Sequence, residues 1–95
     1  MEFAPEARAD LLYIFEAIEA AASASVALAY LNRLEAYCFG FELFAERGRA
    51  RDDIRPGLRT TGFERRVTLV FSVDETTVTF LRLFYGGQDW ERAFR

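Results

Sequence analysis

The stretch that decides the fold is Val78-Thr-Phe-Leu-Arg82-Leu-Phe-Tyr85-Gly-Gly87-Gln-Asp89, an apolar run that carries one arginine and ends in two glycines. β-Branched and aromatic residues followed by Gly-Gly predict a strand that ends in a tight turn, because glycine reaches positive φ without penalty. Strand alternation predicts two apolar faces, with Val78, Phe80 and Phe84 on one and Leu81, Leu83 and Tyr85 on the other. A strand that is apolar on both faces needs cover on both.

The segments before this strand predict two partner strands. Arg66 to Val73 alternates, and its apolar face consists of Val67, Leu69, Phe71 and Val73. Asp74-Glu-Thr76 then turns the chain toward the closing strand, which we expect from Thr77 to Tyr85. Leu58 to Phe63 can form a further short strand. The pattern predicts a meander of antiparallel strands.

Two amphipathic helices precede the strands. Pro5 suits the first position of a helix, and Glu6 places an anion at the positive end of its dipole. We expect this helix to end near Ala22 and a second to begin near Ser25. Their apolar stripes are Ala7, Leu11, Ile14 and Ile18 in the first, and Ala27, Leu31, Leu34, Cys38 and Phe41 in the second. The short link between them predicts an antiparallel hairpin.

The chain of 95 residues predicts a single domain, 1–95, of the α+β class. We expect the N-terminal antiparallel helical hairpin to pack on a small antiparallel β-sheet. A loop from Glu46 to Gly57 joins them, and a short C-terminal helical tail from Asp89 to Phe94 follows. The hairpin can cover one face of the sheet. Nothing else in the chain is large enough to cover the second face, so we predict that a partner covers it.

Composition excludes several classes of function. The chain has one cysteine, no histidine and no lysine, which excludes disulfide frameworks, Cys/His zinc sites and every His-dependent catalytic triad within it. We therefore predict no metal site, no cofactor and no catalytic residues. The N-terminus lacks the pattern of a signal peptide, and no apolar run reaches membrane-spanning length. We expect a cytoplasmic protein.

Arg82 is a permanent charge inside an apolar run, where a guanidinium without a partner is costly. Two hypotheses remain open: a pair with Asp89 that pins the turn, or direct contact with a target. The same two hypotheses apply to Arg59, which follows a Pro-Gly turn. Trp90 is either a packing anchor for the tail or an interface residue.

Three motifs in this order resemble the ParE branch of the RelE/ParE toxins of bacterial toxin–antitoxin systems. They are Phe3-Ala-Pro-Glu-Ala-Arg-Ala-Asp-Leu11, Arg55-Pro-Gly-Leu-Arg59 and Arg82-Leu-Phe-Tyr-Gly-Gly-Gln-Asp89. The resemblance implies a helical hairpin against a small sheet. It also implies a cognate ParD-like antitoxin, a ribbon-helix-helix DNA-binding protein whose C-terminal segment would supply the missing cover.

The resemblance implies that DNA gyrase is the target, inhibited by binding rather than catalysis. The target-facing residues we infer are Arg59, Arg82, Tyr85, Gln88, Asp89 and Trp90. The antitoxin-facing residues are Leu12, Phe15, Val70, Leu81 and Leu83. The alternative from the RelE branch is a ribosome-dependent endoribonuclease that cuts messenger RNA, with Arg59, Arg82 and Tyr85 as its chemistry.

Two features depart from the family pattern. Only Met1-Glu-Phe3 precede Pro5, so a first edge strand is expected to be shortened or missing. Gln88 stands where the family commonly has arginine. This second departure leaves open a third hypothesis, that the chain is an attenuated or inactive copy that only binds antitoxin.

Overall fold

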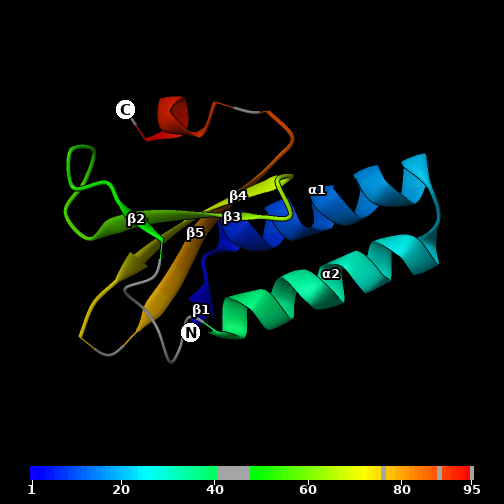
Figure 1. The fold of residues 1–95 in the computed structure, drawn as a ribbon, viewed down its shortest axis with the longest axis horizontal. Coiled ribbons are helices and arrows are strands. Elements are labelled where there is room, and N and C mark those ends of the chain that lie inside the picture. Colours follow the sequence, from blue (N-terminus) through cyan, green and yellow to red (C-terminus); the bar gives the residue numbers. More distant parts are fainter. Residues whose placement is uncertain (41–47, 76, 88, 95) are drawn as a thin grey trace.

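The computed structural model of the chain describes residues 1–40, 48–75, 77–87 and 89–94. Along the described chain, two long helices precede most of a five-stranded sheet, and a short 3-10 helix ends it (Figure 1). The elements are β1 (Glu2–Phe3), α1 (Pro5–Ala21), α2 (Ala24–Phe39), β2 (Arg49–Ala50), β3 (Leu58–Phe63), β4 (Val67–Val73), β5 (Val78–Tyr85) and η2 (Trp90–Ala93). The α+β class predicted from the sequence is confirmed.

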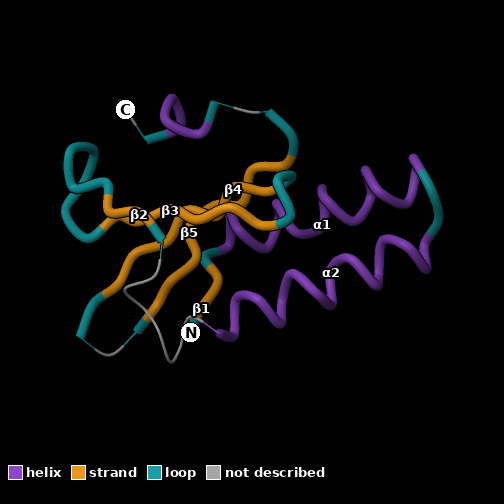
Figure 2. Tube along the Cα trace, viewed as in Figure 1, coloured by secondary structure: helices purple, strands orange, loops and turns teal. Residues whose placement is uncertain are grey.

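Helices α1 and α2 form the expected antiparallel hairpin, joined by a short turn (Figure 2). Helix α1 begins at Pro5, and the backbone of Ala4 before it donates to the Phe80 carbonyl oxygen at 2.9 Å. Helix α2 begins one residue before the predicted start because Ser23 caps it, its hydroxyl accepting from the Val26 amide at 3.2 Å. Phe41, the end of the predicted second stripe, lies outside the described residues.

The sheet has the strand order β1-β5-β4-β3-β2. The pairs β3–β4 and β4–β5 are antiparallel, as predicted. The pair β2–β3 is also antiparallel, whereas β1 pairs with β5 in parallel. Strand β1 has two residues, which agrees with the expected short first strand. Strand β2 lies in the segment for which we predicted only a loop.

A β-bulge in β5 changes which of its residues face the helices. Val70 pairs with Arg82 and Phe71 pairs with Phe80, so Leu81 is an extra residue opposite β4. One inserted residue reverses the alternation beyond it. Phe80 and Leu83 therefore both belong to the core under the helices, and Phe84 lies on the opposite face. The predicted faces of Leu83, Phe84 and Tyr85 are wrong for this reason.

The larger core lies between the hairpin and the sheet. Phe71 and Phe80 on neighbouring strands are fully buried there, with ring centroids 5.6 Å apart. Phe3 of β1 stacks on Phe80 at 5.2 Å, and Tyr37 of α2 contacts Phe63 at 5.2 Å. Burying each aromatic side chain contributes about 2 kcal/mol of transfer free energy. The predicted packing of the hairpin on one sheet face is confirmed.

The second sheet face is covered by the chain itself, so the prediction that only a partner could cover it is wrong. Leu58, Val70 and Phe84 are buried on that face. Their cover comes from the tail and the loop before β3, through Ile54, Trp90 and Phe94. We call residues 89–94 the tail.

Arginines from the loop hold the tail in place. Arg51 lies over the Trp90 ring, with its guanidinium carbon 5.0 Å from the centroid, and pairs with Glu91 at 2.9 Å. Arg55 lies over the Phe94 ring at 5.3 Å. These cation–π contacts join a loop and a terminus that are far apart in sequence.

Candidate functional site at the edge of the closing strand

Arg82 is paired with Asp10 of α1, so the predicted partner Asp89 is wrong. Its Nε donates to Asp10 Oδ2 at 2.7 Å and its Nη2 donates to Oδ1 at 3.1 Å. The Leu83 amide donates to the same carboxylate at 2.9 Å. Strand β1 pairs with β5 only at Thr79 and Phe80, so the edge of β5 is open beyond that point. The Leu83 amide belongs to this open part of the edge, and Asp10 satisfies it.

The Asp10–Arg82 pair is partly shielded from water. The side chain of Asp10 is 15% exposed and that of Arg82 is 33% exposed. Hydrogen bonding to Asp10 raises the pKa of Arg82, although partial burial opposes this shift. The guanidinium carbon also lies 4.6 Å from the centroid of the Phe84 ring. Arg82 is therefore a permanently charged group held in one orientation.

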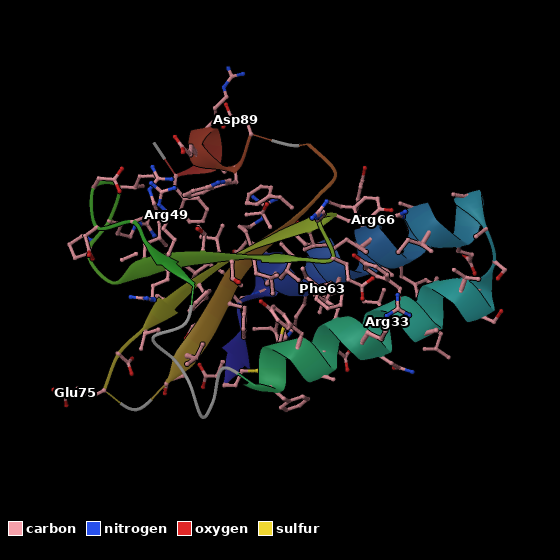
Figure 3. The ribbon with its side chains drawn as sticks, viewed as in Figure 1. Arg33, Arg49, Phe63, Arg66, Glu75 and Asp89 are labelled. Atoms are coloured by element: carbon pink, nitrogen blue, oxygen red, sulfur yellow. The ribbon has the colours of Figure 1, made fainter. Side chains whose placement is uncertain are left out.

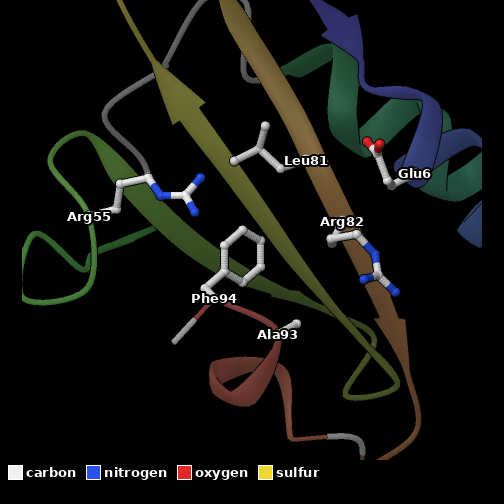
Figure 4. A pocket seen from close by; sticks show the side chains of 6 residues that line it. All are labelled: Glu6, Arg55, Leu81, Arg82, Ala93 and Phe94. Carbon is white, nitrogen blue, oxygen red and sulfur yellow. The ribbon is translucent and has the colours of Figure 1, made fainter.

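Two pockets meet at Arg82. One, of about 260 Å³, lies between β5 and the tail, and Figure 4 shows Arg55 and Arg82 on its two sides with Leu81 and Phe94 between them in that view. The other, of about 140 Å³, lies toward α1 and is lined by Asp10 and Tyr85 among others. Both pockets are lined by the Arg82 guanidinium, so the site offers a permanent positive charge for recognising a partner group.

The five described residues inferred to face the target lie on different parts of the sheet. Arg82 and Tyr85 line the same pocket, on the side of the helices. Trp90 packs on the opposite sheet face, and Asp89 beside it is exposed. Arg59 donates to the Gly48 carbonyl oxygen at 3.2 Å. Gln88 lies outside the described residues.

The geometry does not bring together the three residues of the endoribonuclease hypothesis. Arg59 is opposite Phe71 of β4, which is in turn opposite Phe80 of β5. It therefore lies two strands away from the strand that carries Arg82 and Tyr85, a separation of about 10 Å. Tyr85 is also five residues beyond Phe80 along β5. Arg59 therefore lies on a different part of the sheet from Arg82 and Tyr85.

The residues inferred to face the antitoxin are also separated. Leu12 is 60% exposed on α1, and Phe15 is half-buried against the larger core. Val70 and Leu83 are buried on opposite faces of the sheet, so they do not line one open groove. Leu81 is half-buried on the second sheet face, where the tail packs. Their separation follows from the bulge in β5 and from the packing of the tail on the second sheet face.

Sequence reasoning missed other exposed apolar side chains, which lie on the helices. They are Tyr13, Val26, Leu28 and Phe39, each at least half exposed. All four lie beside the predicted apolar stripes rather than on them. This position in the sequence pattern could have indicated that they are exposed.

The described residues contain no group of three or more His, Cys, Asp or Glu side chains that could hold a metal ion. Cys38 is buried in the core, and burial raises the pKa of its thiol to about 12. In the part of the chain that the structure describes, neither helix is long and apolar enough to cross a membrane.

Comparisons with known proteins agree with this fold. No curated protein matches the sequence. A solved structure described as the chromosomal ParDE TA system from P. aeruginosa has a similar fold, with a TM-score of 0.77 and 23% sequence identity over 90% of this chain and 92% of that one. Residues 1–90 match the model of a family described as the ParE toxin of type II toxin–antitoxin system, parDE. Because this match covers nearly the whole sequence, the chain belongs to the ParE toxin family.

Proposed function

We propose that this toxin inhibits DNA gyrase by binding to it, and that a cognate ParD-type antitoxin neutralises it in the cytoplasm. The observation that carries the binding mechanism is the state of Arg82. Asp10 fixes it with two hydrogen bonds, and the sequence offers no histidine or lysine as a proton carrier. A fixed cation is suited to recognising a surface and unsuited to general acid–base chemistry.

The target-facing surface that we propose is the end of β5 together with the start of the tail. Arg82 and Tyr85 line a pocket at this strand end, and Asp89 is exposed beyond the turn. We include Gln88 and Trp90 in this surface because they adjoin Asp89 in the sequence. Arg59 is left out because it lies two strands away.

The antitoxin-facing surface that we propose begins at Leu12 and Phe15 on α1 and continues to Leu81 at the edge of the tail. Val70 and Leu83 support this surface from within the two cores. An antitoxin segment could contact Val70 only after the tail had left the second sheet face, because the side chain is fully buried.

A supercoiling assay with purified gyrase tests the target. We expect the chain to inhibit supercoiling and to increase the amount of cleaved DNA, and we expect added antitoxin to reverse both effects. An unchanged gyrase activity at high molar excess would refute the target. Codon-linked cleavage of messenger RNA in a translation assay, with gyrase unaffected, would replace it by the endoribonuclease alternative.

Two matched variants test the surface. Asp89→Asn removes one exposed carboxylate from the proposed surface, and Glu75→Gln removes another at the distant turn between β4 and β5. Figure 3 labels both positions. We expect Asp89→Asn to weaken inhibition several-fold and Glu75→Gln to leave it unchanged. Equal effects of the two variants would show that the surface is placed wrongly.

The attenuation hypothesis has its own test, because it concerns one residue. Gln88→Arg restores the residue that the family commonly carries. Stronger growth inhibition by this variant than by the natural chain would show that Gln88 attenuates the toxin. Unchanged inhibition would remove Gln88 as a cause.

A further inference from the structure

The turn that joins α1 to α2 extends beyond the end of the sheet (Figure 1). A pocket of about 400 Å³ lies between this end of the hairpin and the turn between β3 and β4. We call it the hairpin pocket. Its apolar part is formed by Ile18, Val26 and Ala29, and Val26 is 50% exposed.

Tyr30 lines the hairpin pocket and has an unsatisfied hydroxyl. Its side chain is 5% exposed, and the hydroxyl oxygen is buried without a hydrogen-bond partner among the described residues. Its ring is held edge-on against Phe63, with centroids 5.6 Å apart, and Arg33 lies over the ring at 5.3 Å. Buried hydroxyls are nearly always hydrogen-bonded, so this one calls for a hydrogen-bond partner that the described residues do not supply.

The hydroxyl is a donor at neutral pH. Burial raises the pKa of Tyr30, and the Glu64 carboxylate raises it further, so the proton stays on the oxygen. The hydroxyl can therefore donate to a hydrogen-bond acceptor.

The charges around the hairpin pocket favour a single negative charge. Arg33 is neutralised by Glu64 through two hydrogen bonds of 2.9 and 3.2 Å. Arg66 also lines the pocket and has no ion pair in the part of the chain that the structure describes. Figure 3 labels Arg33 on α2 and Arg66 at the turn between β3 and β4. The pocket thus carries one uncompensated positive charge.

The turn that carries Glu64 and Arg66 has an unusual backbone. Glu64 and Arg65 have φ values of 49° and 59°, and the Arg66 amide donates to the Phe63 carbonyl oxygen at 3.0 Å. Both central residues of this tight turn are left-handed without being glycine. The turn directs Glu64 and Arg66 toward the end of the hairpin.

We propose that the hairpin pocket binds a peptide segment of a partner protein that presents a glutamate side chain beside an aliphatic residue. The glutamate carboxylate pairs with Arg66, and it accepts from the Tyr30 hydroxyl once the side chains that bury this oxygen have moved. The aliphatic side chain packs on Val26 and Ala29. A purely apolar segment would leave the hydroxyl unpaired. A phosphorylated segment would bring two negative charges against the Glu64 carboxylate.

The probe for this proposal is the peptide acetyl-Leu-Glu-Ala-Leu-amide, titrated into the ¹⁵N-labelled full chain and followed by NMR. Its matched control is the same peptide with glutamine in place of glutamate. We expect saturable shifts at the amides of Val26, Tyr30 and Arg66, with the glutamine peptide binding about tenfold more weakly. Equal binding of the two peptides, or shifts confined to another surface, would overturn the proposal.

Two variants of the chain sharpen the test. Tyr30→Phe removes only the hydroxyl, and we expect it to weaken binding of the glutamate peptide about tenfold while the thermal midpoint stays equal or rises. A lower midpoint would show that the hydroxyl already has a partner and would overturn the proposal. Arg66→Gln is expected to weaken binding similarly, whereas Arg65→Gln, on the same turn but outside the pocket, is expected to change nothing.

A third arm separates a peptide from a free carboxylate. Acetate that saturates the same amides as tightly as the peptide would assign the pocket to a small carboxylate and overturn the peptide occupant. These measurements use neither gyrase nor antitoxin, so their outcome is independent of the proposed function.

Discussion

Replacing Asp10 by alanine tests how much the edge of β5 depends on one carboxylate. The change removes two hydrogen bonds from Arg82 and one from the Leu83 amide. A hydrogen bond to a charged group contributes about 1.5–3 kcal/mol, and the exposure of Arg82 places the bidentate pair at the lower end of that range. The unpaired Leu83 amide adds about 1 kcal/mol. We expect Asp10→Ala to lower the free energy of unfolding by about 2–3 kcal/mol.

Urea denaturation monitored by circular dichroism measures this loss. The control is Glu16→Ala, which removes an exposed carboxylate from the same helix and is expected to change stability by less than about 0.5 kcal/mol. For a domain of this size, the Asp10→Ala loss corresponds to a fall in thermal midpoint of about 10–20 °C. A double-mutant cycle with Arg82→Gln separates the ion pair from the Leu83 contact.

Two results would refute this reasoning. If Asp10→Ala were as stable as the Glu16→Ala control, the carboxylate would not hold the strand edge. If the cycle gave a coupling energy near zero between Asp10 and Arg82, their pairing would contribute nothing beyond the Leu83 contact. In the second case Arg82 would be free to reorient toward a target.

Further predictions concern the tail, Gly48 before β2 and the buried thiol. Trp90→Ala removes part of the cover over Val70 and is expected to cost about 2 kcal/mol in urea denaturation, with a rise in dye binding to apolar surface; an unchanged midpoint would show that the tail does not contribute. Gly48→Ala should cost about 2 kcal/mol by the same measurement, because the residue has a φ of 84° and its Cβ would lie 2.5 Å from the Thr60 carbonyl oxygen; a neutral effect would contradict this conformation. Burial raises the pKa of Cys38 to about 12, from 9.0, so between these pH values the unfolded chain loses a proton that the folded chain keeps, and stability falls as pH rises. Urea denaturation at pH 8 and pH 10 should show that the free energy of unfolding falls by about 1 kcal/mol less in a Cys38→Ala variant than in the natural chain. An equal fall in both chains would contradict this prediction.

The helices and most strand limits could be predicted because their signals are local. Pro5 begins α1 in the structure as in the sequence pattern. Strand β3 has the predicted limits, and the alternating residues Val67, Leu69 and Phe71 all face the hairpin. These features depend on spacings of two, three and four residues, which the chain carries whatever its neighbours are.

The candidate site was predicted only in part. The unusual position of Arg82 in an apolar strand was correctly singled out, but its partner is 72 residues away in the sequence. Asp10 reaches Arg82 because β1 is short and leaves the adjoining edge of β5 open to α1. The order of strands in a sheet decides such a contact, and local spacing contains no information about it.

The apolar closing strand and the amphipathic hairpin were thus determined by the sequence itself, since side-chain periodicity depends on backbone geometry alone. Tertiary structure decided the rest. The bulge at Leu81 depends on how β5 pairs with β4, and it reverses the faces of Leu83 and Phe84. The second sheet face is closed by Trp90 and Phe94 because the tail folds back onto it, a contact between distant segments that forms only when the sheet is assembled.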